Sequence, residues 1–154
     1  GQDSKVIRLN DDGSVKNFVM NDKCAAGTGR FLEMMAKTME MSLDELSKVG
    51  LSYQEDITIS SMCTVFAESE VVSLIAQNKA TDDIVHGLNK AVAAKTASLV
   101  KRVGGEEAYM MTGGVAQNQG LVKTLEERLG TKLVISDKSQ LCGALGAALF
   151  ATEM

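Results

Sequence analysis

The chain has 154 residues, a formal net charge of −4, 45% hydrophobic residues and three cysteines. This length suits one domain with its own core, and the lack of a basic stripe argues against a nucleic-acid binder, because phosphates must be neutralised by cations. No apolar run approaches the roughly 20 residues that span a bilayer, no signal peptide is recognisable and the cysteines form no disulfide framework, so we expect a cytoplasmic protein without a membrane partner.

The first part of the chain predicts a β-hairpin followed by a helix. Within residues 4–20, two apolar-rich runs, 5–9 and 15–20, flank a polar turn in which Gly13 can take a positive φ. A helix is predicted from about residue 27 to 40, because apolar side chains recur there along one stripe.

The middle of the chain predicts two more helices and a short strand. The segment Ser42-Leu43-Asp44-Glu45 has the form of a capping box and predicts a short helix after it. Residues 57–59 predict a strand, and a helix is expected over 63–77 with Ser60 or Ser61 as its N-cap.

The longest predicted helix begins at Thr81 and ends near Gly104. Its apolar face is marked by Ile84, Leu88, Val92 and Leu99. Beyond it the pattern alternates: a strand over 108–111, a helix over 118–129, a strand over 132–135 and a small-residue helix over 139–152. A hairpin followed by alternating strand and helix units indicates a single α/β domain over residues 1–154, with a mixed sheet and flanking helices.

A glycine pair lies between a predicted strand and a predicted helix, in Thr112-Gly113-Gly114-Val115-Ala116-Gln117-Asn118. Glycines there let the backbone approach a ligand, and the following helix offers N–H groups and the positive end of its dipole. The turn lacks the Lys and Ser/Thr of a P-loop and the spacing of a dinucleotide fingerprint. A tight connection without a ligand remains the alternative.

Polar side chains also precede the first hairpin, in Gly1-Gln2-Asp3-Ser4-Lys5. A carboxylate and an amide at this place could hold hydrated Mg²⁺ or orient a water beside a nucleotide. Taken alone, the segment equally fits a solvated end of the chain.

Cys24 and Cys63 each stand just before a predicted helix start. Two thiolates per chain are too few for a four-iron cluster, whereas a symmetric dimer would supply four. The same placement would also lower a free thiol's pKa and make it reactive, and ordinary packing cysteines fit as well. Neither lies in a C-x₂-C run, so spacing alone does not identify an iron–sulfur site. Cys142, on a small-residue helix, is expected to pack closely, and His86 to be a surface or satisfied histidine rather than a ligand.

Taken together, these segments resemble the activator ATPases of 2-hydroxyacyl-CoA dehydratases and the related ATPase subunits of benzoyl-CoA reductase. The matching segments follow one another in family order along the whole chain: residues 1–5, 21–31, 61–70 and 112–116. The two cysteine segments are specific to these activators, whereas the glycine pair is shared with many actin-like ATPases.

The resemblance implies an actin-like, ribonuclease H-like fold in which two related α/β domains close over ATP or ADP with Mg²⁺. It implies a homodimer with one [4Fe–4S] cluster between the subunits, held by two cysteines from each. By position, the cluster ligands are Cys24 and Cys63, the second phosphate motif is Gly1, Gln2 and Asp3, and the adenosine motif is Gly113, Gly114 and Val115. A ferredoxin or flavodoxin is the implied electron donor, and a dehydratase or reductase component is the implied acceptor of the electron that ATP hydrolysis drives.

Such activators also carry an N-terminal domain with the first phosphate loop, and nothing in residues 1–154 corresponds to it. We therefore expect the C-terminal half of an activator, with cluster ligands and part of an adenosine site but without complete catalytic machinery. Two rivals remain: an actin-like phosphotransferase of the sugar or carboxylate kinase type, and a non-enzymatic dimerisation module. Both predict no bound iron.

Overall fold

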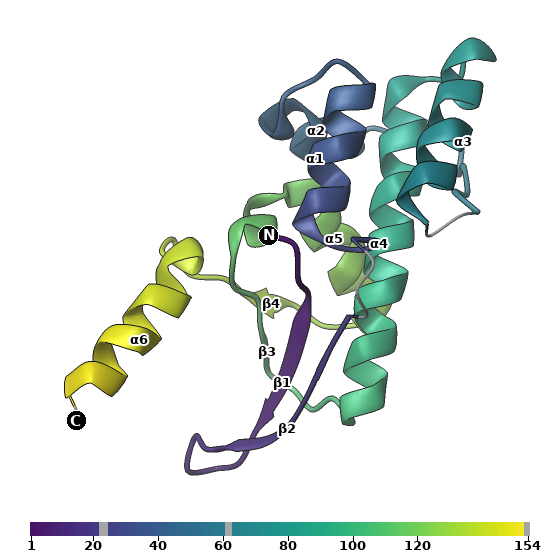
Figure 1. The fold of residues 1–154 in the computed structure, drawn as a ribbon. Helices are drawn as coiled ribbons and strands as arrows, with labels where there is room; N and C mark the ends of the chain where they lie inside the picture. Colours follow the sequence, from purple (N-terminus) through teal and green to yellow (C-terminus); the bar gives the residue numbers. More distant parts are fainter. Residues whose placement is uncertain (22–24, 61–62, 153–154) are drawn as a thin grey trace.

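The structure is a computed structural model that describes residues 1–21, 25–60 and 63–152. Cys24 and Ser61 lie outside these ranges. The elements, shown in Figure 1, are β1 (Lys5–Leu9), β2 (Val15–Met20), α1 (Gly29–Thr38), α2 (Leu43–Val49), α3 (Thr64–Ala76), α4 (Thr81–Val103), β3 (Tyr109–Met110), the 3₁₀ turn η1 (Gly114–Gln117), α5 (Gln119–Leu129), β4 (Leu133–Val134), the 3₁₀ turn η2 (Ser139–Leu141) and α6 (Cys142–Thr152).

The predicted hairpin is confirmed. Strands β1 and β2 pair antiparallel, with Ile7 opposite Phe18, and Gly13 closes the turn with a φ of 82°. Val6 and Val19 are half-buried, whereas Ile7 and Phe18 on the opposite face are exposed. Helix α4 contacts both strands, so one face of the hairpin is covered and the other is apolar and open.

The helix ends follow from local capping chemistry. The capping box at α2 is confirmed, because Ser42 Oγ accepts from Glu45 N–H and the Glu45 carboxylate accepts from Ser42 N–H. The predicted N-cap of α3 is wrong: Cys63 occupies that position, and Ser60 instead donates from its N–H to the Glu70 carboxylate at 3.0 Å. The strand predicted at 57–59 is also absent from the described residues, and Ile57 and Ile59 there are buried in the core without strand pairing.

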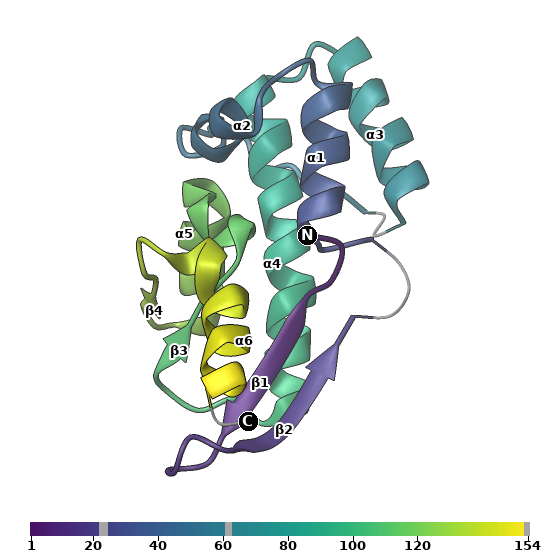
Figure 2. The same ribbon diagram turned by 60° about the vertical axis from the view of Figure 1, so that its left-hand side comes forward.

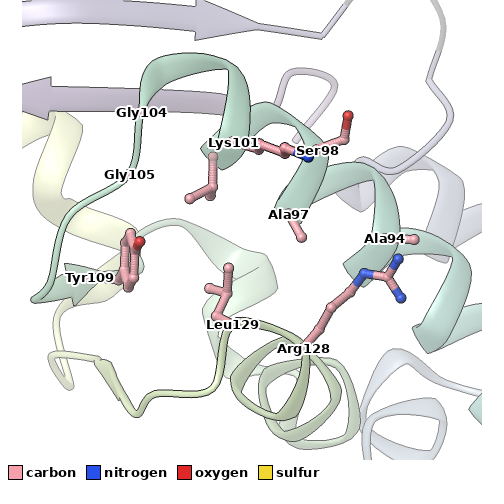
Figure 3. Close-up of a pocket in the computed structure, with 10 residues that line it drawn as sticks. Ala94, Ala97, Ser98, Lys101, Gly104, Gly105, Tyr109, Arg128 and Leu129 are labelled. Atoms are coloured by element: carbon pink, nitrogen blue, oxygen red, sulfur yellow. The ribbon is translucent and has the colours of Figure 1, made fainter.

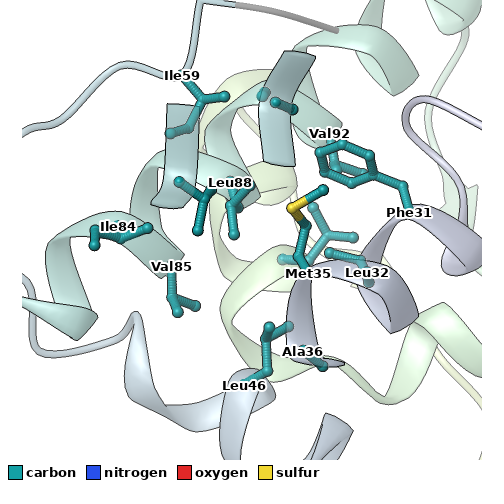
Figure 4. Packing of buried hydrophobic residues seen from close by; sticks show 14 of the residues in the cluster. Phe31, Leu32, Met35, Ala36, Leu46, Ile59, Ile84, Val85, Leu88 and Val92 are labelled. Carbon is teal, nitrogen blue, oxygen red and sulfur yellow. The ribbon is translucent and has the colours of Figure 1, made fainter. Parts of the chain in front are cut away.

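The core lies between α1, α2, α4 and α5, and Figure 4 shows its packing. Fully buried members include Phe31, Met35, Leu46 and Leu88. In Figure 2, α4 runs between α3 and α5, and it contacts both. This central place explains why a helix of 23 residues has buried side chains on more than one face.

The predicted mixed sheet is only partly realised. The described residues contain two separate two-stranded sheets, antiparallel β1–β2 and parallel β3–β4. Antiparallel and parallel pairing are thus both present. Strands β3 and β4 have only two residues each, so they offer few backbone N–H and C=O groups that could pair with β1 or β2.

The close packing predicted for Cys142 is wrong. Helix α6 has no buried residue, Cys142 is half-buried, and Leu145 and Phe150 are exposed. Figure 1 shows α6 leading away from the helical core. Its apolar composition is therefore not explained by packing within the described part of the chain.

Candidate nucleotide-binding site and cysteine segments

Three segments distant in sequence meet at the start of α1, beside the N-terminus (Figure 1). A Cβ placed on Gly29 would lie 2.6 Å from the Gly1 nitrogen and 3.1 Å from Val115 Cγ2. Because real Cβ atoms essentially never come this close to backbone, only glycine allows the approach. The structure thus brings together Gly1 and Val115, which the sequence assigned to separate nucleotide motifs.

Hydrogen bonds hold the first residues along the segment that leads into α1. Arg30 N–H donates to the Gly1 carbonyl at 2.9 Å, and Ser4 Oγ donates to the Gly27 carbonyl at 3.0 Å. Gly1 and Ser4 are therefore bonded to the segment that leads into α1, and Gly1 is exposed there.

The N-terminus of α1 carries no side-chain cap. Thr28 is the N-cap residue, but its hydroxyl donates to the Ala25 carbonyl at 2.6 Å instead of accepting from the helix. Helix N-terminal amides that lack a side-chain acceptor, together with the helix dipole, form a favourable place for an anion. This end of α1 lies against Gly1, next to the predicted phosphate segment.

Gln2 and Asp3 are exposed at the same place. The Asp3 carboxylate forms an ion pair with Lys5 Nζ at 3.1 Å, with about half of each side chain exposed. An exposed carboxylate at this position fits the predicted contact with hydrated Mg²⁺.

The glycine pair forms the expected strand-to-helix turn after β3. Gly113 has a φ of 90° and donates its N–H to the Ser139 carbonyl at 2.8 Å. The turn continues through η1, after which Asn118 Oδ1 accepts from Leu121 N–H at 2.9 Å and caps α5. Val115, which follows the glycine pair, lies beside the start of α1, where the other two segments converge.

Sequence reasoning missed Gly29 and Ser4. The pattern Gly27-Thr28-Gly29 by itself indicates only flexible backbone beside Cys24, because the hairpin gives no sequence cue that its first residues return to this segment. The contact is made by tertiary structure alone.

Cys63 is the N-cap residue of α3 and is exposed. Cys24 lies outside the described residues, so its predicted proximity to Cys63 is not described. Among the residues that the structure does describe, no three His, Cys, Asp or Glu side chains converge as a metal-ligand set. Cys63 is exposed at the N-terminus of α3, which is the positive end of the helix dipole. A side chain at such a place is well positioned to bind an anionic group.

The acidic side chains in α3 have structural partners. Glu68 accepts from Thr38 Oγ1 at 3.0 Å, and Glu70 accepts from Ser60. These contacts attach α3 to α1 and to the segment before Cys63, so they orient the helix that Cys63 begins.

His86 is buried rather than at the surface. Its ring stacks on Tyr53 with centroids 3.4 Å apart, and Nε2 lies 3.7 Å from Asp56 Oδ1. Burial lowers the pKa of His86 below its ordinary value of 6.5, although the Asp56 carboxylate opposes this in part. His86 is thus a satisfied interior histidine, as one of the two sequence interpretations had it.

A separate pocket of about 790 Å³ lies between α4, α5 and the start of β3 (Figure 3). Tyr109, Lys101 and Arg128 line it, and it contains none of the predicted site residues. Gly104, at its edge, lies close to Arg8 near the far end of β1, so this pocket is remote from Gly1.

These features define a member of the actin-like ATPases, and the chain belongs to the BadF/BadG/BcrA/BcrD ATPase family, whose model matches residues 1–151. The chain is 50% identical over 153 residues to the 2-hydroxyisocaproyl-CoA dehydratase activator of Clostridioides difficile, covering 99% of this chain and 58% of that protein. It is 48% identical over 151 residues to the (R)-2-hydroxyglutaryl-CoA dehydratase activating ATPase of Acidaminococcus fermentans, covering 98% and 58%.

A solved structure of the Clostridium difficile 2-hydroxyisocaproyl-CoA dehydratase activator, with bound ADPNP, superposes with a TM-score of 0.95. The match has 49% identity and covers 99% of this chain and 57% of that one. The chain therefore spans somewhat more than half the length of the relatives it matches. No helix within the described ranges has the length and apolar character needed to cross a membrane.

Proposed function

We propose that this chain provides the C-terminal domain of an ATP-dependent electron-transfer activator that serves a 2-hydroxyacyl-CoA dehydratase or a benzoyl-CoA reductase-type enzyme. The observation that carries this proposal is the convergence of Gly1, Gly29 and Val115 at a helix start without a side-chain cap, in a chain of this ATPase family. The names of the two relatives reported above support a 2-hydroxyacyl-CoA dehydratase as the partner enzyme.

In this proposal the nucleotide lies across the converging segments. Gly1, Gln2 and Asp3 hold the phosphates and hydrated Mg²⁺, while the turn at Gly113–Val115 faces the adenosine. The N-terminus of α1, which has no side-chain cap, adds positive potential where the phosphates would lie. The bound ADPNP in the 49% identical structure supports nucleotide binding by this fold.

Cys24 and Cys63 are the proposed ligands of a [4Fe–4S] cluster shared by two copies of the chain. Two thiols from each of two chains make the four that such a cluster requires. When bound, the cluster supplies one electron at a time at low potential, received from a ferredoxin or flavodoxin and passed to the dehydratase or reductase. The chain's own contribution is to hold exposed Cys63 at the start of α3, whose N-terminal amides stabilise negative charge.

The test is iron and acid-labile sulfide per chain after anaerobic purification, with molar mass measured in parallel. Four iron shared by two chains predicts about two iron per chain. Cys24→Ala and Cys63→Ala should each abolish iron binding, whereas the matched Cys142→Ala variant should retain it. Iron that survives Cys24→Ala would sink the cluster assignment, and an iron-free dimer would favour the phosphotransferase or dimerisation hypotheses instead.

A further inference from the structure

A second cavity of about 410 Å³ continues the cavity of Figure 3 along helix α4, and the two share Ala94 and Arg128 as lining residues. On α4 the lining residues run from Gly87 to Lys101, a length of about 21 Å at about 1.5 Å per residue. The two cavities thus form one elongated depression, the α4 groove, which follows α4 from Gly87 past Ala94 to Lys101, with Arg128 of α5 beside it.

The charge of the α4 groove is positive. Four of its lining residues are basic, namely Lys90, Lys95, Lys101 and Arg128, and none of the described lining residues is acidic. Lys90 is paired with Asp56, whereas no carboxylate in the described part of the chain forms an ion pair with the other three. Because the whole chain has a net charge of −4, these three uncompensated cations make the groove a local exception that attracts an anionic ligand.

The floor of the α4 groove between these charges is apolar and low. Ala91, Ala94 and Ala97 line it at a spacing of three residues on α4. Their short side chains let another backbone come as close as the roughly 8–10 Å that separates the axes of packed helices. In Figure 3, Arg128 reaches from α5 toward Ala94, and Leu129 lies across from α4. The groove therefore has an apolar floor with cationic groups at its sides.

The size of the α4 groove favours a helix over a small molecule. Its two parts, of about 790 and 410 Å³, together exceed the roughly 300–1,000 Å³ of typical small-molecule sites. Its length of about 21 Å is that of an α-helix of four turns, at about 5.4 Å per turn. The net charge of −4 opposes the extended anionic surface of a membrane or a nucleic acid, which a single helix does not present.

We propose that the α4 groove is a docking site for an acidic amphipathic helix of another protein. Apolar side chains of the incoming helix, spaced three and four residues apart, pack on the alanine floor, and carboxylates beside them pair with Lys95, Lys101 and Arg128. This inference goes beyond the proposed function, because none of the described residues of the predicted nucleotide and cysteine segments lines the groove. Binding at the groove requires neither nucleotide nor iron.

The probe is a fluorescent peptide of about 14 residues, the length that fills about 21 Å as a helix. It carries alanine and leucine on one face and glutamate beside them, and a covalent bridge between positions i and i+4 holds it helical, because free peptides of this length are marginal helices. A permuted peptide of identical composition and charge, but without an apolar face, is its control. Binding to the 154-residue chain is followed by fluorescence anisotropy up to about 1 mM peptide.

The matched protein variants differ only in where two charges are reversed. Lys101→Glu with Arg128→Glu changes the groove, whereas Lys16→Glu with Lys37→Glu makes the same change in net charge at exposed residues of β2 and α1. The groove variant should bind the amphipathic peptide about tenfold more weakly or worse, and the control variant should bind it as the parent chain does. The permuted peptide should also bind the parent chain about tenfold more weakly.

Lysine acetylation followed by mass spectrometry locates the bound peptide on the unaltered chain. The amphipathic peptide should slow acetylation of Lys95 and Lys101 relative to Lys16 in the same molecule, and this readout does not depend on how any variant folds. No binding up to about 1 mM, equal binding of the two peptides, or no protection of Lys95 and Lys101 would each overturn the proposal. Stronger binding to vesicles that contain phosphatidylserine than to the peptide, lost in the groove variant, would assign the groove to a membrane surface instead.

Discussion

Replacement of Gly29 by alanine tests the central contact of the candidate site. The new Cβ would lie 2.6 Å from the Gly1 nitrogen, 3.1 Å from Val115 Cγ2 and 3.2 Å from the Gly1 oxygen. Two of these neighbours are backbone atoms, which cannot rotate away as a long side chain can. To restore an ordinary contact of about 3.4 Å, the first residues must move by roughly 0.8 Å, the difference between 3.4 and 2.6 Å.

Overpacking of this kind costs about 1–3 kcal/mol, partly offset by the gain of up to about 1 kcal/mol when alanine replaces a helical glycine. Gly146→Ala is the matched control, because Gly146 lies in α6 and a Cβ added there would meet no atom within 4 Å. Gly146→Ala should show the gain in stability when alanine replaces a helical glycine, without the steric clash. The difference between the two variants in free energy of unfolding should therefore be about 1–3 kcal/mol.

The assay is urea unfolding of both variants, followed by calorimetric titration with MgADP. Gly29→Ala should also weaken ADP binding, because the clash displaces Gly1 from the proposed phosphate contacts. If Gly29→Ala equals Gly146→Ala in both stability and ADP affinity, the converging segments do not form the nucleotide site.

Two further predictions concern the core and its histidine. Phe31 is completely buried, so Phe31→Ala should lower the free energy of unfolding by about 3–5 kcal/mol, whereas Phe150→Ala, at a side chain 72% exposed, should change it by less than about 0.5 kcal/mol; equal losses in urea unfolding would contradict the described core. Because burial lowers the pKa of His86, the unfolded chain takes up this proton more readily than the folded chain. The contribution of neutral His86 to stability should be complete above pH 6.5 and be lost as the pH falls through 6.5 toward the lower folded pKa. His86→Gln should remove that slope from a series of urea unfolding curves, and a slope that persists would assign the titration to another group.

Much of the secondary structure was predictable, because its causes are local. The capping box at Ser42 and Glu45, the positive φ at Gly13 and the end of α4 at Gly104 each depend on residues a few positions apart. The errors occur where a distant residue competes for the same groups. Ser60 failed as an N-cap because its N–H and hydroxyl bond to Glu70 on the next helix.

The candidate site likewise has parts that the sequence predicted and parts that it did not. The glycine pair at Gly113 was recognisable, since a strand, two glycines and a helix follow one another directly. The fit of Gly29 against Gly1 and Val115 was not, because it joins three segments separated by many residues. The cysteine positions were found only through resemblance to a family, as their spacing does not identify a metal site.

Apart from the strand expected at 57–59, the sequence by itself determined the order of strands and helices and the chemical character of each segment, since hydrophobic period, caps and turn glycines act over one or two turns. Tertiary structure alone decided which segments meet. It placed residues 1–4 along the start of α1, enclosed His86 against Tyr53 and left α6 outside the helical core. The physical reason is that burial and hydrogen bonding between distant residues depend on how all the elements pack together, which no local pattern encodes.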